Sequence, residues 1–166
     1  MKIGLLSDTH GTLDPKVLEF FKNCDEIWHA GDIGNEATAN QFEQFKPFRA
    51  VFGNIDGFDL RLRFKLTEIF NCEETQVLMT HIGGYPGHYE KNVASLLSEI
   101  KPKIFICGHS HILRVINDKK HDLLYLNPGA AGNSGFHTVK TALRFEINGK
   151  NIQNMEVFEL KRDVSR

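Results

Sequence analysis

Side chains that can bind a metal ion follow several short apolar runs of this sequence, at the points where strands are expected to end. These side chains are Asp8, His10, Asp32, Asn54, His81, His109 and His111. Each group comes directly after an apolar segment, and ligands of α/β sheets gather at the carboxyl ends of strands. We therefore expect the separate segments to bring these side chains to one edge of the fold.

Each segment alone has a plainer interpretation. Asp8 and His10 are two residues apart and can grip one ion from the same side, but such a pair also occurs in surface turns with a capping aspartate. Asp32 could be the N-cap of a helix, and His81 could be a satisfied core or loop histidine. These plainer interpretations are independent of one another, and all of them would have to hold at once. A single metal site therefore explains the pattern better.

The donor set indicates the kind of metal. It holds carboxylates, imidazoles and one amide, and no thiolate. Mixed imidazole and oxygen donors favour Mn²⁺, Fe²⁺ or Zn²⁺ over Ca²⁺, which prefers oxygen alone. The donors are too many for one ion and fit two, with Asp32 between them.

The elements that must position these residues alternate in type, which predicts an α/β fold. Strands are expected at residues 2–7, 26–29, 49–52, 64–70, 76–80, 103–107, 113–116, 123–126, 141–147 and 152–160. Helices are expected at residues 15–23, 36–45 and 89–100. The first half reads as βαβ units and the second as antiparallel strands, with a tight hairpin at Asn148-Gly149, so mixed sheets are expected.

Composition restricts the remaining possibilities. The 166 residues, 41% of them hydrophobic, predict a single domain over 1–166 with a polar, frayed tail at 161–166. A formal net charge of −1 gives no support to nucleic acid as a partner. No apolar run suits a signal peptide or a membrane span, so a cytoplasmic protein without a membrane partner is expected. Cys24, Cys72 and Cys107 form no C-x-x-C pair and are interpreted as core residues.

The motifs Asp8-Thr9-His10, Gly31-Asp32, Gly53-Asn54, His81 and Gly108-His109-Ser110-His111 resemble the signature of the calcineurin-like metallophosphoesterases. Asn127-Pro128-Gly129 resembles a further turn of that family, and the short chain is similar to its small bacterial and archaeal phosphodiesterases, often called YfcE-like.

This resemblance implies a four-layer α-β-β-α sandwich of two mixed sheets with two divalent metal ions at one edge, Mn²⁺ first and Fe²⁺, Zn²⁺ or Ni²⁺ as alternatives. By position, Asp8, His10, Asp32 and His111 would hold one ion, and Asp32, Asn54, His81 and His109 the other. The hypothesis that follows is hydrolysis of a small phosphate ester, most simply a phosphodiester, by a hydroxide that bridges the two ions while Asn54 helps to neutralise the phosphate oxygens.

One position departs from the family pattern. Many relatives continue Gly-Asn with a histidine that is thought to protonate the leaving group, whereas this chain has Ile55 followed by Asp56. Isoleucine donates no proton, so Asp56 lacks the partner that it would orient. His88, in the loop after His81, is a candidate substitute.

Other polar residues near the motifs have plainer interpretations. The glycine-rich stretch 127–135 is a candidate loop beside the site, with a simple turn between strands as the favoured alternative. Arg114 and His137 are candidates for contact with substrate, with an ordinary surface residue as the favoured interpretation of each. Phe58 and Phe136 are candidates for a dimer surface of a homo-oligomer.

Competing classes of function are weighed against these motifs. Neither a G-x-x-x-x-G-K-[ST] phosphate loop nor a G-x-S-x-G nucleophile elbow occurs. The main alternative is a protein-interaction scaffold, since a retromer subunit of eukaryotic trafficking resembles this family in fold. A metal-dependent nuclease is a further alternative, although such relatives are usually longer.

Overall fold

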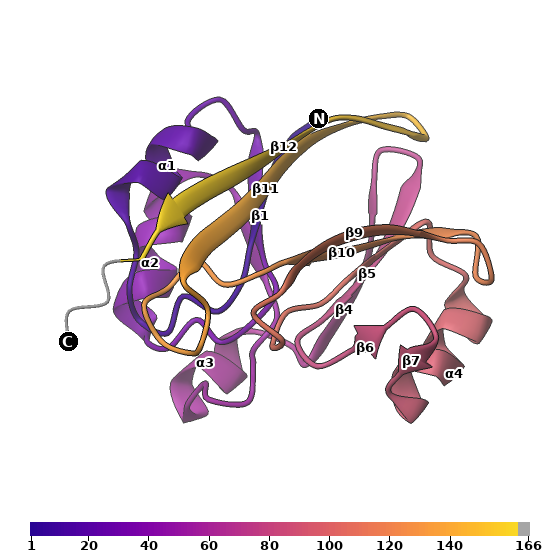
Figure 1. Ribbon diagram of the computed structural model, residues 1–166, viewed down its shortest axis with the longest axis horizontal. Helices are drawn as coiled ribbons and strands as arrows, with labels where there is room; N and C mark the ends of the chain where they lie inside the picture. The colour runs from indigo at the N-terminus through magenta and orange to yellow at the C-terminus, as the bar shows by residue number, and fades with distance from the viewer. Residues whose placement is uncertain (163–166) are drawn as a thin grey trace.

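The computed structural model describes residues 1–162 and shows two five-stranded sheets facing each other, with helices on both outer sides (Figure 1). The first sheet has the strand order β12-β11-β1-β2-β3 and the second the order β4-β5-β8-β10-β9. Each sheet combines parallel and antiparallel pairs. The expected α/β sandwich of two mixed sheets is therefore confirmed.

The elements have the following bounds. The strands are β1 (Lys2–Leu6), β2 (Glu26–His29), β3 (Phe48–Ala50), β4 (Thr67–Cys72), β5 (Thr75–Thr80), β6 (Gly84–Tyr85), β7 (His88–Tyr89), β8 (Ile104–Ile106), β9 (Leu113–Asp118), β10 (Leu123–Pro128), β11 (Val139–Asn148) and β12 (Asn151–Lys161). The helices are α1 (Pro15–Phe21), α2 (Glu36–Phe45), α3 (Phe58–Arg63) and α4 (Lys91–Ile100).

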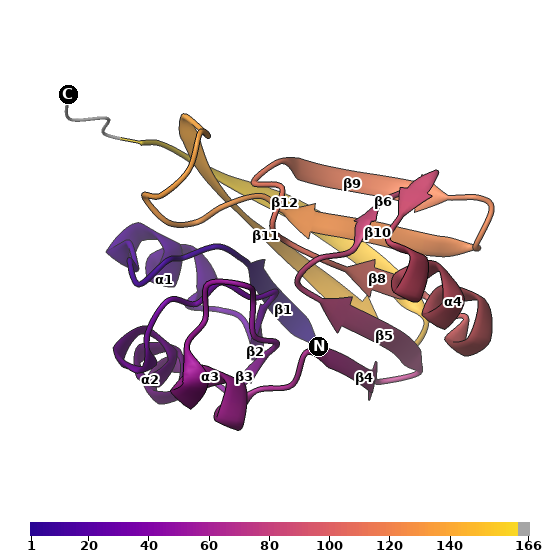
Figure 2. The same cartoon turned by 90° about the horizontal axis from the view of Figure 1, so that it is seen from below.

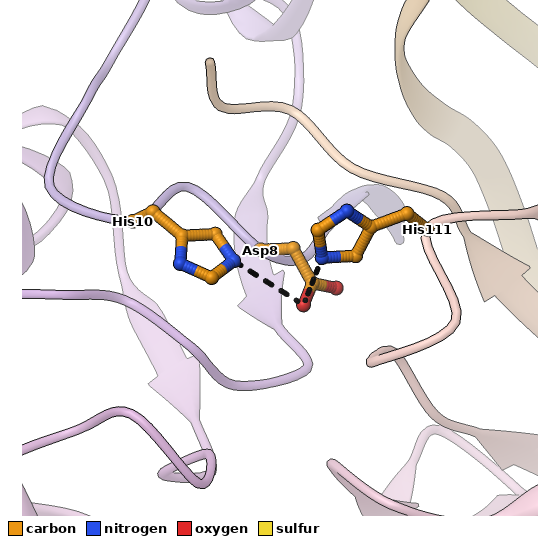
Figure 3. A group of neighbouring side chains, drawn as sticks. All are labelled: Asp8, His10 and His111. Atoms are coloured by element: carbon orange, nitrogen blue, oxygen red, sulfur yellow. Dashed lines mark ion pairs between the residues drawn. The ribbon is translucent and has the colours of Figure 1, made fainter. Parts of the chain in front are cut away.

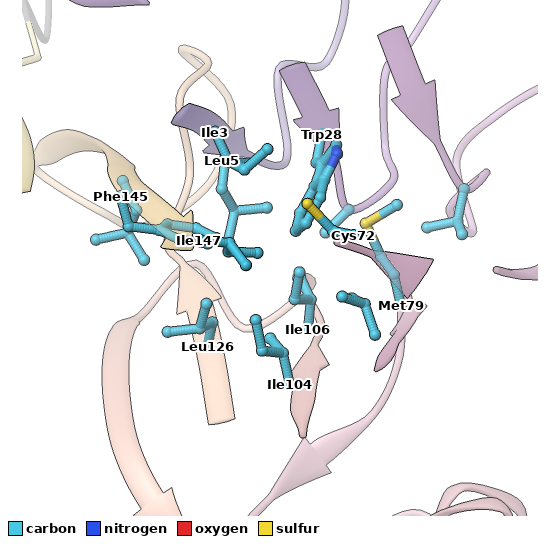
Figure 4. Packing of buried hydrophobic residues seen from close by; sticks show 14 residues of the cluster. Ile3, Leu5, Trp28, Cys72, Met79, Ile104, Ile106, Leu126, Phe145 and Ile147 are labelled. Carbon is cyan, nitrogen blue, oxygen red and sulfur yellow. The ribbon is translucent and has the colours of Figure 1, made fainter. Parts of the chain in front are cut away.

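The core between the sheets comes from alternate residues of the strands. Ile3 and Leu5 of β1 are fully buried there, where they meet Met79 and Ile106 of the second sheet (Figure 4). Leu6 points to the opposite face and packs with the helices. This alternation follows from the two-residue period of a strand, and it buries both faces of β1.

The outer layers are amphipathic helices that begin at good caps. The Asp14 side chain accepts a hydrogen bond from Lys16 N ahead of α1, and Asn35 caps α2 in the same way. Helices α1 and α2 cover the first sheet, whereas α4 buries Val93 and Leu97 against the second sheet (Figure 2). Since β1 and β2 thus lie between helices and the other sheet, their polar ends are the parts that remain open for chemistry.

Three short elements were not expected from the sequence. Helix α3 has six residues and buries only Leu60 of them, and β6 and β7 have two residues each. Residues Asn127 and Pro128 end β10 instead of forming a turn. The hairpin at Asn148-Gly149 is confirmed, since Asn148 pairs with Asn151 across a two-residue loop.

Three further expectations concern the cysteines, a membrane span and the tail. All three cysteines are free and buried, as expected of core residues. Over the described residues, no helix is long and apolar enough to cross a membrane. Strand β12 continues to Lys161, so the frayed tail was predicted too early, and its last residues, 163–166, lie outside the described residues.

Candidate metal centre

The ligand candidates all follow strands that run parallel within their sheets. Asp8 and His10 follow β1, Asp32 follows β2, and Asn54 comes shortly after β3. His81 follows β5, and His109 and His111 follow β8, in the second sheet. The structure therefore brings the five segments to one edge, where the carboxyl ends of both sheets meet.

The first donor set is Asp8, His10 and His111, whose ligand atoms all lie within 4.8 Å of one another. The dashed lines of Figure 3 join Asp8 Oδ1 to His10 Nε2, at 3.8 Å, and to His111 Nε2, at 3.2 Å. Asp8 is fully buried, and the two imidazoles approach its carboxylate from the solvent side.

The second donor set is Asp32, His81 and His109, again with ligand atoms within 4.8 Å of one another. His81 Nε2 lies 3.2 Å from Asp32 Oδ2 and 3.1 Å from Asn54 Oδ1. Asp32 Oδ2 is also 3.8 Å from His10 Nε2 of the first set. Asp32 thus lies between the two sets, and Asn54 belongs with the second.

Hydrogen bonds assign the free nitrogen of His81. Its Nδ1 lies 2.8 Å from the carbonyl oxygen of Ala30, which can only accept, so Nδ1 carries a proton. Nε2, which faces Asp32 and Asn54, is then the nitrogen that can bind an ion. Burial acts to lower the pKa of His81, but the hydrogen bond and charge of Asp32, together with the charge of Asp8, raise it overall. Burial acts to raise the pKa of Asp32, but the hydrogen bond with His81 opposes this effect, and the pKa is lowered overall.

Two buried atoms in the centre fit a metal ion and little else. Asp8 Oδ1 and His10 Nε2 are buried side-chain atoms that have no hydrogen-bond partner in the described part of the chain. A buried carboxylate oxygen without a partner is costly, and a divalent cation among imidazole and carboxylate donors would satisfy both atoms. The residues present therefore fit divalent metal ions.

The backbone at the ligands is unusual. Five of the candidate ligands have positive φ angles: Asp8 at 55°, His10 at 48°, Asp32 at 55°, His109 at 66° and His111 at 58°. Non-glycine residues rarely adopt this left-handed region, and such strain concentrates at functional sites. The backbone of Gly53 lies so close to Asp32 that a Cβ at this position would be 2.0 Å from Asp32 Oδ1.

Asp56 is buried beside the centre, and among the described residues its carboxylate is hydrogen-bonded to backbone nitrogens and to no side chain. Its carboxylate accepts hydrogen bonds from the backbone nitrogens of Ile33, Gly34 and Gly53, at 3.2, 2.7 and 2.8 Å. Ile55 occupies the position of the family histidine and is 45% exposed, and its backbone nitrogen donates to Asp32 Oδ1 at 3.0 Å.

His29 is a buried histidine that sequence reasoning missed. Thr9 Oγ1 donates to the carbonyl of Ile33, so it accepts from His29 Nε2, and Gly31 N donates to His29 Nδ1 at 3.1 Å. Burial lowers the pKa of His29 to about 4, in agreement with this neutral ring. The available signal was a histidine in an apolar strand, just before the turn of Asp32.

Of the remaining candidates, some lie away from the donor sets and others lie beside them. His88 is exposed on the β6–β7 hairpin, with its ring 5.0 Å from that of Tyr85, and no contact among the described residues joins it to the ligands. Arg114 also lies over Tyr85. The glycine-rich stretch does lie beside the site, because Gly132 N donates to Asp8 O, and His137 contacts the ring of His111. His137 is thus not the ordinary surface residue that the sequence indicated.

Comparisons with known proteins agree with this geometry. The chain is 27% identical over 135 residues to a probable metallophosphoesterase of Methanothermobacter thermautotrophicus, covering 78% of this chain and 77% of that protein. It is 27% identical over 145 residues to a phosphodiesterase of Methanocaldococcus jannaschii, covering 78% and 83%. The solved structure of Entamoeba histolytica Vps29 complexed with zinc superimposes with a TM-score of 0.76 at 15% identity, over 97% and 99% of the chains.

The family model of the calcineurin-like phosphoesterase superfamily domain matches residues 1–150. This match covers every ligand candidate and both sheets as far as β11. The chain therefore belongs to the calcineurin-like phosphoesterase superfamily.

Proposed function

We propose that this chain is a phosphodiesterase that hydrolyses small phosphate esters at a binuclear metal centre. The observation that carries the proposal is the pair of facing donor sets, with Asp32 between them and with the unpartnered buried atoms Asp8 Oδ1 and His10 Nε2. Asp8, His10, Asp32 and His111 would hold one ion, and Asp32, Asn54, His81 and His109 the other. We propose Mn²⁺ as the metal, with Fe²⁺, Zn²⁺ or Ni²⁺ as alternatives.

The protein residues divide the work of such a centre. Two divalent ions, when bound, supply a water molecule acidified toward neutral pH and positive charge beside the phosphate. The Asn54 side chain is exposed at the mouth, where its amide group can meet a phosphate oxygen. Asp56 holds the turns that carry Asp32 and Asn54, and His29 is bonded to Thr9 and Gly31 beside Asp8 and Asp32, which keeps the donors in place without solvent rearrangement.

A diester suits the surroundings of the centre better than a monoester. One groove of about 370 Å³ lies beside Asn54 and His81 and is lined by Arg61 and Ile82. Another, of about 480 Å³, lies beside His109 and His111 and reaches Phe136. These two of the grooves that border the centre would accept a phosphate that carries one organic group on each side.

The leaving group would depart with little help from a protein acid. Ile55 stands where relatives have a histidine, and His88 is joined to the ligands by no contact in the described region. We therefore propose a preference for aryl and other stable leaving groups. His88→Ala tests the remaining candidate acid. If esters with poor leaving groups are hydrolysed at an unchanged rate, His88 is not the acid. If the rate falls for these esters alone, His88 is established as the acid.

The direct test uses metal-stripped protein with restored Mn²⁺. Release of nitrophenol is followed from bis-nitrophenyl phosphate and from nitrophenyl phosphate, for the native chain, for Asp32→Asn and for Asp59→Asn, an exposed carboxylate of α3. The expected result is metal-dependent diester hydrolysis that Asp32→Asn lowers by more than roughly 100-fold and Asp59→Asn leaves unchanged. A folded protein that turns over neither ester with Mn²⁺, Fe²⁺ or Zn²⁺ would contradict the proposal.

One observation favours the scaffold as a second candidate. Phe58 and Leu62 of α3 are 74% and 70% exposed, and Leu66 beyond it is 58% exposed, which gives an apolar patch near Asn54. If no ester is hydrolysed, this patch is the first surface to test by Phe58→Ser and Leu62→Ser for loss of binding to a partner protein.

A further inference from the structure

His137 contacts the first donor set from a loop that is far away in the sequence. Its Nδ1 lies 3.2 Å from His111 Nδ1, and the ring centroids are 5.0 Å apart at an interplanar angle of 77°. The other nitrogen of His137, Nε2, lies 3.0 Å from the carbonyl oxygen of Gly132. His137 thus joins its own loop to a metal ligand.

These contacts assign the protons of the His137 and His111 rings. The Gly132 carbonyl can only accept, so His137 Nε2 carries a proton. His111 presents Nε2 to the first donor set, and a ring that binds an ion through Nε2 carries its own proton on Nδ1. In the contact between the two rings, His137 Nδ1 is then the acceptor of that proton. The proton on Nδ1 leaves His111 Nε2 with a free electron pair, and this nitrogen lies 3.2 Å from Asp8 Oδ1.

The loop that carries His137 is fastened on both sides of this contact. Ala131 N and Gly132 N donate to the carbonyls of Ser7 and Asp8, and Arg162 donates to the carbonyl of Gly135. Gly135 approaches so closely that a Cβ there would lie 2.3 Å from His111 Nδ1. The position of His137 is therefore fixed by backbone contacts with the segment that supplies Asp8.

We infer that His137 is a positioning residue that holds His111 in the tautomer and orientation needed to bind a divalent ion through Nε2. The inference rests on the metal sites of the proposed function but concerns one donor set only. Outer partners of metal-bound histidines usually change metal affinity by about 10–100-fold when they are removed.

The first test reads the proton directly. Nitrogen NMR of ¹⁵N-histidine protein, metal-free and at a pH where free histidine is neutral, should show His111 protonated at Nδ1. In His137→Leu this preference should be lost, whereas His137→Asn, whose side-chain oxygen can still accept, should retain it. A wild-type His111 without a proton on Nδ1 overturns the inference.

The second test measures metal binding by calorimetry with Mn²⁺ and Zn²⁺. His137→Leu should weaken one of the two sites by about 10–100-fold and leave the other unchanged, and His137→Asn should recover most of the loss. The control is His121→Leu, which removes a histidine bonded to Asp118 outside the centre. If His137→Leu binds both ions like the native chain, the inference is wrong.

The two tests separate this inference from the proposed function. If the native chain binds no divalent ion, the proposed function fails, and the NMR measurement still decides whether His137 orients His111. If His137→Leu does not fold, the tautomer in the native chain and in His137→Asn gives the same decision.

Discussion

Asp56 and Gly34 are joined by a hydrogen bond of 2.7 Å from the backbone nitrogen of Gly34 to Asp56 Oδ1. The same carboxylate accepts from Ile33 and from Gly53, so one buried side chain ties the turn of Asp32 to the turn of Asn54. The second donor set therefore depends on a residue that binds no metal.

Asp56→Ala is expected to lower the free energy of unfolding by about 3 kcal/mol or more, because three backbone N–H groups lose their acceptor in a buried place. Asp56→Asn retains one acceptor oxygen and should cost less. Urea denaturation measures both, with exposed Asp59→Ala as the control. Equal stability of Asp56→Ala and Asp59→Ala would contradict the role given to Asp56.

Metal ions should stabilise the fold through Asp8. Its buried Oδ1 has no partner among the described residues, so an ion bound there relieves a cost that the metal-free chain carries. At a hundred times Kd, an ion adds about 2.7 kcal/mol, which corresponds to about 5–10 °C in Tm for a chain of this size. Thermal denaturation with Mn²⁺ and with chelator should show this shift, and Asp8→Asn should reduce it strongly.

Asp118 gives a pH dependence that is separate from the centre. Burial acts to raise its pKa, but hydrogen bonds from His121, Tyr89 and the Lys120 backbone outweigh this and lower it. A pKa that is lower in the folded than in the unfolded chain stabilises above the unfolded value, near pH 4, and the gain is lost as pH falls through the folded value. The free energies of unfolding of the native chain and of Asp118→Asn should thus differ by about 2 kcal/mol at pH 7, and this difference should shrink as the pH falls below 4. A constant difference would refute this.

The cysteines should resist thiol reagents in the folded protein. Burial raises the pKa of Cys24, Cys72 and Cys107 to about 11, and their thiolates are the reactive forms. A colorimetric thiol assay at pH 8 should find almost no fast-reacting group in the native state and three in denaturant. Rapid reaction of the native protein would show that one of these side chains is open to solvent.

The parts of the site that could be predicted from the sequence are the ligands that directly follow an apolar strand. An apolar run of β1 that changes abruptly to Asp8 and His10 shows both the strand and its ligands. The same pattern occurs before Asp32 and His81. Because parallel strands share the direction of their carboxyl ends, their common edge follows without knowledge of the loops.

Other parts depend on contacts that no local pattern contains. Helix α3 was missed because Phe58 and Leu62 are exposed, so that no apolar face repeats along its six residues. His137 was misjudged because its partner, His111, is 26 residues away and the path of the loop decides the contact. The contacts of Asp56 could not be predicted either, since its partners are backbone nitrogens, which every sequence contains.

The left-handed backbone at Asp8 bears on how this protein could change during evolution. Asparagine tolerates this conformation as well as aspartate does, and it carries no charge that must be neutralised in the interior. One base change converts an aspartate codon to an asparagine codon, so a lineage could lose the proposed metal binding here in a single step while the sandwich remained intact. Loss of catalysis would then leave a stable surface on which selection for binding could act.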